Sequence, residues 1–255
     1  TAILGLCAAL SIQVFTGIVG FISQSTSFLG PLNLHWPGPI DIATRAASVI
    51  KLSDGQIFLR AYGTLPHPNI LGGFAFICIA GPIALFLRKE KPNSFALLLL
   101  ALGSSLLALS FSRSAWIAVA IFLSALIYRS KFFNPKKTTV LFLTTIAAIG
   151  LTLFPLRELV ISRTVAPTTT TEEFSIAGRV WLTEQAITVI KEHPLLGVGA
   201  GSFIIQLAER AGESNFVEPV HNIPLLITSE LGILGLILIL AIIFSIGKDF
   251  FQTKN

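Results

Sequence analysis

Residues 222–247 read NIPLLITSELGILGLILILAIIFSIG and carry a single charged side chain, Glu230. An apolar stretch of about 20 residues is long enough to cross the hydrocarbon core of a bilayer as a helix. The rest of the chain is similar, because 53% of its 255 residues are hydrophobic and only 12% are charged. Soluble domains carry about 25% charged residues. The sequence therefore predicts an all-α polytopic membrane protein.

Six membrane spans are predicted within a single membrane domain that covers residues 1–255. They lie near residues 1–23, 70–87, 95–111, 113–129, 138–155 and 222–247. Two short basic loops, residues 88–91 and 129–137, are expected in the cytoplasm, since positive charge is retained on that side. An alternating topology then places the loop of residues 156–221, and all four histidines, on the external face.

Three further expectations follow from composition. The chain begins at Thr1 and contains no methionine, so we expect it to be part of a longer protein, and its first segment is interpreted as a span, not a signal peptide. Cys7 and Cys78 lie in apolar stretches and are expected to pack as small hydrophobic side chains. The net charge of +5 is not gathered on one soluble face, which argues against nucleic acid as a partner.

The external loop contains one amphipathic segment. Residues 165–173, VAPTTTTEE, are predicted to form a linker. A helix is expected to start at Ser175, as its N-cap, and to end before Pro194. Arg179 falls on the apolar arc of this helix, although such a helix packs its apolar arc on the membrane interface or on other helices.

Two arginines are candidate site residues, Arg179 for binding an anion and Arg113 as an arginine at membrane depth that faces an internal cavity. Arg113 stands between two apolar runs, and Arg179 stands on the apolar arc. Each could instead anchor the chain at the membrane interface. Charged side chains in apolar settings often mark functional sites, however, and the planar guanidinium fork suits phosphate.

His221 is the candidate for proton transfer, because a neutral imidazole accepts a proton near neutral pH. It lies where the external loop re-enters the membrane, next to Asn222, and Glu230 follows deeper in the same span. Arg60 and His67 precede the second span and are further candidates for the same external site. Each of these side chains has a purely structural alternative.

Other motifs are weak. The stretch Gly197–Gly201, GVGAG, resembles a nucleotide-binding loop, but no strand precedes it and a flexible turn is expected. No spacing of carboxylates, histidines or cysteines is typical of a metal site, and no cofactor is predicted.

Five motifs in order resemble the O-antigen ligase/polymerase superfamily, which consists of bacterial membrane glycosyltransferases. They are RAYGTLPHPN (60–69), LSFSRSAW (109–116), AGRVWLTEQA (177–186), HPLLGVGAGSF (193–203) and HNIPLLITSELGILGL (221–236). The resemblance implies a GT-C-like helical bundle with a large periplasmic loop, of which this chain would lack the N-terminal half. It also implies a polyprenyl-diphosphate-linked glycan donor and no metal. Arg113 and Arg179 match the family's diphosphate-binding arginines, and His221 matches its catalytic histidine.

The function implied is transfer of an envelope glycan, as in lipopolysaccharide synthesis, to an acceptor hydroxyl at the outer face of the bacterial cytoplasmic membrane. The acceptor would be a lipid core for a ligase, a glycan for a polymerase, or a protein for an O-glycosylating enzyme. A bicarbonate-like solute transporter is an alternative of another class, which should show internal repeats and broken helices. A non-catalytic assembly subunit is a third alternative.

Overall fold

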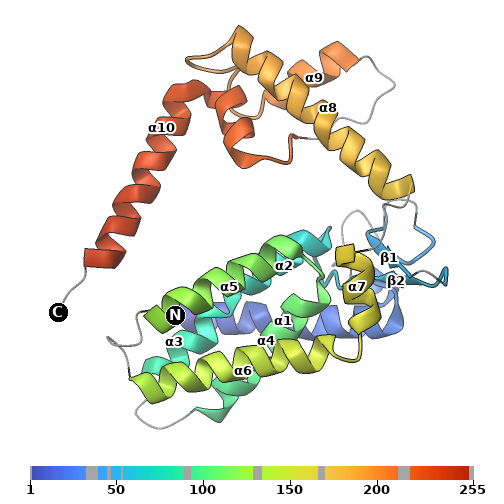
Figure 1. The fold of residues 1–255 in the computed structure, drawn as a ribbon, viewed down its shortest axis with the longest axis vertical. Coiled ribbons are helices and arrows are strands. Elements are labelled where there is room, and N and C mark those ends of the chain that lie inside the picture. Colours follow the sequence, from blue (N-terminus) through green and yellow to red (C-terminus); the bar gives the residue numbers. More distant parts are fainter. Residues whose placement is uncertain are drawn as a thin grey trace. The chain divides into compact units, whose positions relative to one another are not determined.

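The structure, a computed structural model, describes residues 2–32, 40–44, 47–52, 54–88, 93–128, 134–165, 170–211 and 219–252. The chain divides into two compact units, Thr1–Ala166 and Pro167–Asn255. Figure 1 shows both, with the first unit in blue to yellow and the second in yellow-orange to red.

The first unit is a bundle of helices with a small β-hairpin at one end. Its elements, in chain order, are α1 (Ala2–Ser23), the 3-10 helix η1 (Ser27–Leu32), β1 (Val49–Lys51), β2 (Ile57–Leu59), α2 (Pro68–Cys78), α3 (Ala80–Arg88), α4 (Ser94–Leu109), α5 (Arg113–Tyr128), α6 (Pro135–Leu153) and α7 (Arg157–Val165).

Helix α4 is the centre of this bundle. It packs against α1, α2, α3, α5 and α6. It is apolar around its whole circumference, as expected for a helix surrounded by others. Its buried leucines join those of α1 and α2 in one hydrophobic cluster.

Cys7 and Cys78 belong to the same cluster as free thiols, which confirms that they pack as buried hydrophobic side chains.

The expectation of an all-α fold is wrong in one place. β1 and β2 form an antiparallel hairpin, with Val49 opposite Leu59 and Lys51 opposite Ile57. Asp54 and Gly55 lie in the turn between them, and Gly55 adopts a left-handed φ of 89°. An Asp-Gly pair between short runs of β-branched and aromatic residues is a hairpin signal, so this element was visible in the sequence.

Contacts at opposite ends of the first unit agree with the expected alternation of its loops. At one end Lys137 Nζ, near the start of α6, donates to the carbonyl of Leu87 near the end of α3 at 3.3 Å. At the other end Gln24, just after α1, accepts from the amide of Leu59 at 2.6 Å. The basic residues Lys89, Lys91, Arg129 and Lys131, on which the assignment to the cytoplasm depends, lie outside the described residues.

The second unit contains α8 (Thr170–Glu192), α9 (Phe203–Ala211) and α10 (Ile223–Gln252). Both α9 and α10 pack against α8. The three helices share a buried cluster in which Leu182, Ala186 and Val189 of α8 meet Phe203 and Leu207 of α9. A turn of residues 193–202 links α8 to α9.

The start of the amphipathic helix differs from the expectation. α8 begins at Thr170, five residues before Ser175, so the last four residues of the expected linker are helical. Residues 166–169 of that linker lie outside the described residues. Threonine and glutamate cost only a few tenths of a kcal/mol each in a helix, so a Thr-rich composition does not prevent one. The expected end before Pro194 is confirmed.

Four helical stretches in the described part of the chain are long and apolar enough to cross a membrane. They are Ala2–Ser23, Pro68–Arg88, Pro135–Leu153 and Ile223–Ser245. The protein is therefore a multi-pass membrane protein. α4 and α5 are apolar but have 16 residues each, so a total of six spans stays a prediction.

The last span is not one continuous helix. Gly232 has φ 68° and ψ −175°, which breaks α10 into two helical pieces on either side of it. The predicted span near residues 222–247 agrees with the candidate span Ile223–Ser245, but the helix within it is interrupted. By contrast, the separation of α2 from α3 is slight, because the amide of Ile79 still donates to the carbonyl of Ala75 at 3.0 Å.

Candidate functional site

Arg113 is the first residue of α5, directly after the tight connection from α4. Its side chain is exposed. The side chains of Ser112 and Ser114 on either side share a hydrogen bond of 3.2 Å. The first amides of a helix lack partners within it, and their dipoles favour negative charge. The guanidinium and the helix start therefore favour an anion at the same place.

The connection that carries Arg113 is strained. Phe111 has a φ of 47°, in the left-handed region that costs a non-glycine residue about 1–2 kcal/mol. Its ring is fully buried, with ring centroids 6.4 Å from Phe21 and 6.0 Å from Trp116. Burial of this aromatic side chain offsets the backbone strain.

Arg60 holds the same connection from a segment fifty residues earlier. Its side chain is 1% exposed. Nε donates to the carbonyl of Ser110 at 2.8 Å, Nη1 to the hydroxyl of Ser48 at 2.7 Å, and Nη2 to Oδ1 of Asn69 at 2.6 Å. The next amide, that of Ala61, donates to the carbonyl of Leu109 at 3.1 Å. Arg60 thus lies beside the connection between α4 and α5 that carries Arg113. Its three guanidinium nitrogens all donate to groups inside the protein.

The three groups that accept these hydrogen bonds, at Ser110, Ser48 and Asn69, are neutral. Burial raises the pKa of the nearby Tyr62 phenol above its ordinary value, while the Ser48 amide and the charge of Arg60 act in the opposite direction. The Tyr62 oxygen accepts from the Ser48 amide at 2.6 Å. A phenol whose pKa is raised stays protonated at neutral pH, so Tyr62 is not a counter-ion for Arg60.

His67 lies at the start of α2 as its N-cap. Its Nδ1 accepts from the amide of Asn69 at 3.1 Å. Gly72, one turn further on, lies against the α4–α5 connection, because a β-carbon there would be 2.8 Å from the Ser110 hydroxyl and 2.9 Å from the Ser112 β-carbon. The structure therefore brings Arg60, His67 and Arg113 around one connection in the first unit.

Arg179 lies on α8 in the second unit and is exposed. The buried positions of the helix are Leu182, Ala186 and Val189, spaced three and four residues apart. Arg179 precedes Leu182 by one turn, so it continues this buried stripe beyond the cluster with α9. Its side chain is nevertheless exposed, as are residues 177–181 around it, so its expected place on the apolar arc stays a prediction. Val180 and Ile187, which were expected to share the apolar arc, are largely exposed.

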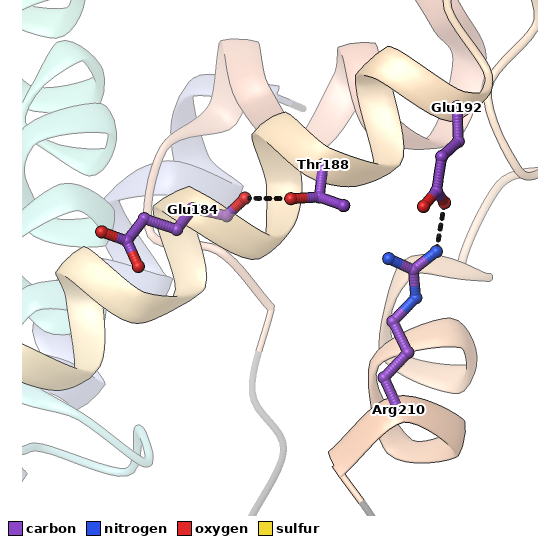
Figure 2. Close-up of polar contacts among 4 residues, drawn as sticks. All are labelled: Glu184, Thr188, Glu192 and Arg210. Atoms are coloured by element: carbon purple, nitrogen blue, oxygen red, sulfur yellow. Dashed lines mark hydrogen bonds and ion pairs between the residues drawn. The ribbon is translucent and has the colours of Figure 1, made fainter.

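The opposite side of α8 is polar. Thr188 donates to the carbonyl of Glu184 at 3.0 Å, and Glu192 forms an ion pair with Arg210 of α9 (Figure 2). The side chains of this pair are 45% and 31% exposed, respectively, so the pair is a surface contact. Arg210 is thus an exposed arginine of the same unit that is paired with a carboxylate.

His221 and Asn222 lie directly before α10, and both are exposed. The side chain of Asn222 accepts from the amide of Leu225 at 3.1 Å, which caps the helix. Val220, on the other side of His221, is buried in the same cluster as Leu182. Arg179 and His221 therefore both flank residues of one hydrophobic cluster in the second unit.

Glu230 lies at the break in α10, where the turn after α8 meets the helix. The main-chain groups freed by the break are bonded to this turn. The bonds are Val198 N to Ser229 O (3.0 Å), Gly199 N to Glu230 O (2.8 Å), Ile233 N to Pro194 O (2.9 Å) and Leu234 N to Leu195 O (3.4 Å). A β-carbon on Gly197 would overlap the main chain of Glu230, and one on Gly232 would overlap the carbonyl of Leu195.

This contact explains the glycines of the GVGAG stretch. Gly197 has a φ of 65° and packs directly on the backbone of α10. The expected turn is confirmed, but it is a packed turn, not a flexible one.

One pair of hydrogen bonds near Arg60 was not predicted from the sequence. Gln13 of α1 donates to the hydroxyl of Thr64 at 2.6 Å and accepts from the Thr64 amide at 3.0 Å. This part-buried pair ties the segment after Arg60 to the first span. A lone glutamine in an otherwise apolar span was the available signal, because polar side chains in membranes usually bond across to another segment.

An apolar groove of about 350 Å³ lies between α1 and α4. Its lining includes Val14, Phe15 and Leu98 but none of the candidate residues, and it has no charged side chain. It therefore suits hydrocarbon, not phosphate. Within the described ranges, no group of three or more histidine, cysteine or acidic side chains is placed to hold a metal ion.

A family model described as O-Antigen ligase (Wzy_C) matches residues 95–240, which is more than half of the chain. Comparison with characterised proteins gave no match, and comparison with solved structures gave none. The matched stretch contains Arg113, Arg179, His221, Asn222 and Glu230, whereas Arg60 and His67 precede it.

Proposed function

Because the chain belongs to the O-antigen ligase family, we propose that it transfers a glycan from a polyprenyl-diphosphate donor to an acceptor hydroxyl at the outer face of the bacterial cytoplasmic membrane. The observation that carries this proposal is the family match, which spans the two candidate arginines and the candidate histidine in a multi-pass membrane protein. Membership of this family supports a lipid-linked glycan as the donor.

In the proposed reaction the acceptor oxygen attacks the anomeric carbon of the donor sugar. The bond from that carbon to the diphosphate oxygen breaks, and polyprenyl diphosphate leaves with the electron pair. The acceptor proton passes to the imidazole of His221, whose exposure leaves it accessible to a substrate. A single displacement of this kind inverts the anomeric configuration.

Arg113 and Arg179 would bind the donor diphosphate. Both are exposed, and Arg113 has the additional support of a helix N-terminus. A diphosphate gains negative charge as it leaves, so fixed positive groups stabilise the transition state as well as the bound donor. A diphosphate is already a good leaving group, and the reaction is accordingly proposed to need no metal.

The broken last span is a feature expected of the transporter alternative, but the bonding at this break differs from that of an ion-coordinating break. Transporters use unwound main-chain carbonyls at such breaks to coordinate ions. Here the carbonyls of Ser229 and Glu230 already accept from the amides of Val198 and Gly199. The break is filled by protein, so it offers no evident ion site.

The test is turnover by the full chain in vesicles that contain a polyprenyl-diphosphate oligosaccharide, with and without EDTA. Release of polyprenyl diphosphate together with transfer of the sugar is the expected result. Release with the donor alone would indicate a polymerase, since the donor glycan is then also the acceptor. Release only after addition of a lipid core or a peptide would indicate a ligase or a protein-glycosylating enzyme. Folded protein that leaves the donor intact under all these conditions would contradict the proposal.

A further inference from the structure

The turn that follows α8 carries two exposed leucines side by side. Leu195 is 61% exposed and Leu196 is 74% exposed. Removing a leucine side chain from water contributes about 1.5–3 kcal/mol. If both leucines of this turn stayed in water, the protein would lose that stabilisation twice. This surface is therefore expected to lie in an apolar environment.

The turn is fixed to the membrane-spanning part of α10. Its carbonyls at Pro194 and Leu195 accept from the amides of Ile233 and Leu234, which begin the second piece of the helix. Ile233, Leu234, Ile237 and Leu238 are all exposed apolar side chains of that piece. The leucines of the turn therefore lie next to the start of the lipid-facing surface of the span.

Helix length places this start inside the bilayer. Residues 233–247 are uncharged and are followed by Lys248. Fifteen helical residues cover about 22 Å, whereas the hydrocarbon core is about 30 Å thick. The hydrophobic span must therefore continue past Gly232 for several ångströms, and the break and its attached turn fall within that distance.

Main-chain bonding agrees with this depth. Irregular backbone is tolerated in the hydrocarbon region only where protein satisfies its polar groups. The four hydrogen bonds between the turn and the break satisfy amides and carbonyls on both sides. The side chains of Leu195 and Leu196 are left as the exposed part of this unit.

We propose that Leu195 and Leu196 are inserted into the acyl-chain region of the bilayer, in the leaflet opposite Lys248. The occupant of this surface is lipid. Lys191 and Glu192 immediately precede the turn and His193 begins it; all three are exposed, and the proposal places them at the level of the headgroups. The C-terminal end of α8, the helix that carries Arg179, is thereby anchored at the membrane surface. The proposal depends on α10 as a span and not on the glycosyl-transfer function.

The test uses the full chain in lipid vesicles with an environment-sensitive fluorophore on Leu196→Cys. Glu209→Cys, at an exposed charged position on α9, is the matched control, and the unsubstituted chain gives the background from its two buried cysteines. Nitroxides attached to lipid acyl chains should quench the label at position 196 several-fold more than the label at position 209. Aqueous iodide should show the reverse order.

Two results would overturn the proposal. Equal quenching of both labels by iodide would place the turn in water. Protection of position 196 from both quenchers would place it against protein. The same measurements on Leu195→Cys provide a second probe if the first variant does not reach the membrane.

Discussion

Nε of Arg60 donates to the main-chain carbonyl of Ser110 at 2.8 Å, so that an arginine before the second predicted span fixes the connection in front of Arg113. The other two donors of the same guanidinium bond to Ser48 and Asn69. One side chain thereby joins the β-hairpin region, the start of α2 and the end of α4. This geometry makes Arg60 a positioning residue for Arg113.

Arg60→Ala should lower the stability of the protein in detergent by about 3 kcal/mol or more, since it leaves buried acceptors without donors and opens a cavity. Arg60→Lys should recover only part of this loss, because one ammonium cannot reach three diverging partners. Thermal unfolding of the purified variants measures both. Arg157→Ala, at an exposed arginine that begins α7, is the matched control and should unfold like the unsubstituted protein. An Arg60→Ala variant as stable as this control would contradict the positioning role.

Gly232→Ala should also be strongly destabilising. Its backbone conformation, φ 68° with ψ −175°, is almost restricted to glycine, and a β-carbon would overlap the carbonyl of Leu195. The expected cost is at least about 2–3 kcal/mol. Thermal unfolding is again the measurement. Gly178→Ala on α8, where a β-carbon meets open space, should leave stability unchanged or raise it by up to about 1 kcal/mol. Equal stability of the two variants would exclude the packed contact between the turn and α10.

Arg179→Ala should weaken donor binding by roughly 10- to 100-fold, since hydrogen bonds to charged groups contribute about 1.5–3 kcal/mol. Arg179→Lys should be similarly impaired, because lysine retains the charge but loses the bidentate fork. Binding of a fluorescent polyprenyl-diphosphate oligosaccharide to the protein in vesicles measures the effect. Arg210→Ala is the matched control, as an exposed arginine of the same unit that is paired with Glu192, and should change donor affinity less than about twofold. Unchanged affinity in Arg179→Ala would remove this arginine from the donor site, as a non-catalytic assembly subunit would require.

His221→Ala should retain donor binding and lose turnover by about 10²–10⁴-fold, the usual contribution of a positioned acid or base. Asn222→Ala serves as the comparison, because Asn222 caps α10 through the amide of Leu225. Loss of that cap should cost about 1 kcal/mol of stability, and turnover should follow the folded fraction. Near-normal turnover in His221→Ala would show that the histidine is structural. A stable Asn222→Ala variant without turnover would assign Asn222 to the site as well.

Sidedness is tested by labelling of single cysteines in intact cells. Ala177→Cys on α8 and Lys136→Cys at the start of α6 are both at exposed positions. A membrane-impermeant thiol reagent should label position 177 from outside and should reach position 136 only after permeabilisation. The opposite pattern would place Arg179 and His221 in the cytoplasm and would exclude an external active site.

The sequence alone determined which segments are helical and apolar, because length and composition are local properties. The helices at Ala2–Ser23 and Pro135–Leu153 lie close to the predicted spans. The helical spacing also predicted that Leu182, Ala186 and Val189 share one face of α8, and all three are buried. The candidate residues were likewise selected from local surroundings, as charged or titratable side chains next to apolar runs.

Only the tertiary structure decided how these segments are held. The break at Gly232 depends on a turn more than thirty residues earlier, whose amides and carbonyls replace those of the helix. Arg60 is buried because its partners come from three separate segments, and no local pattern reports such a set. A hydropathy pattern measures the transfer of each residue into the membrane, but it carries no information on which distant main-chain groups will satisfy one another.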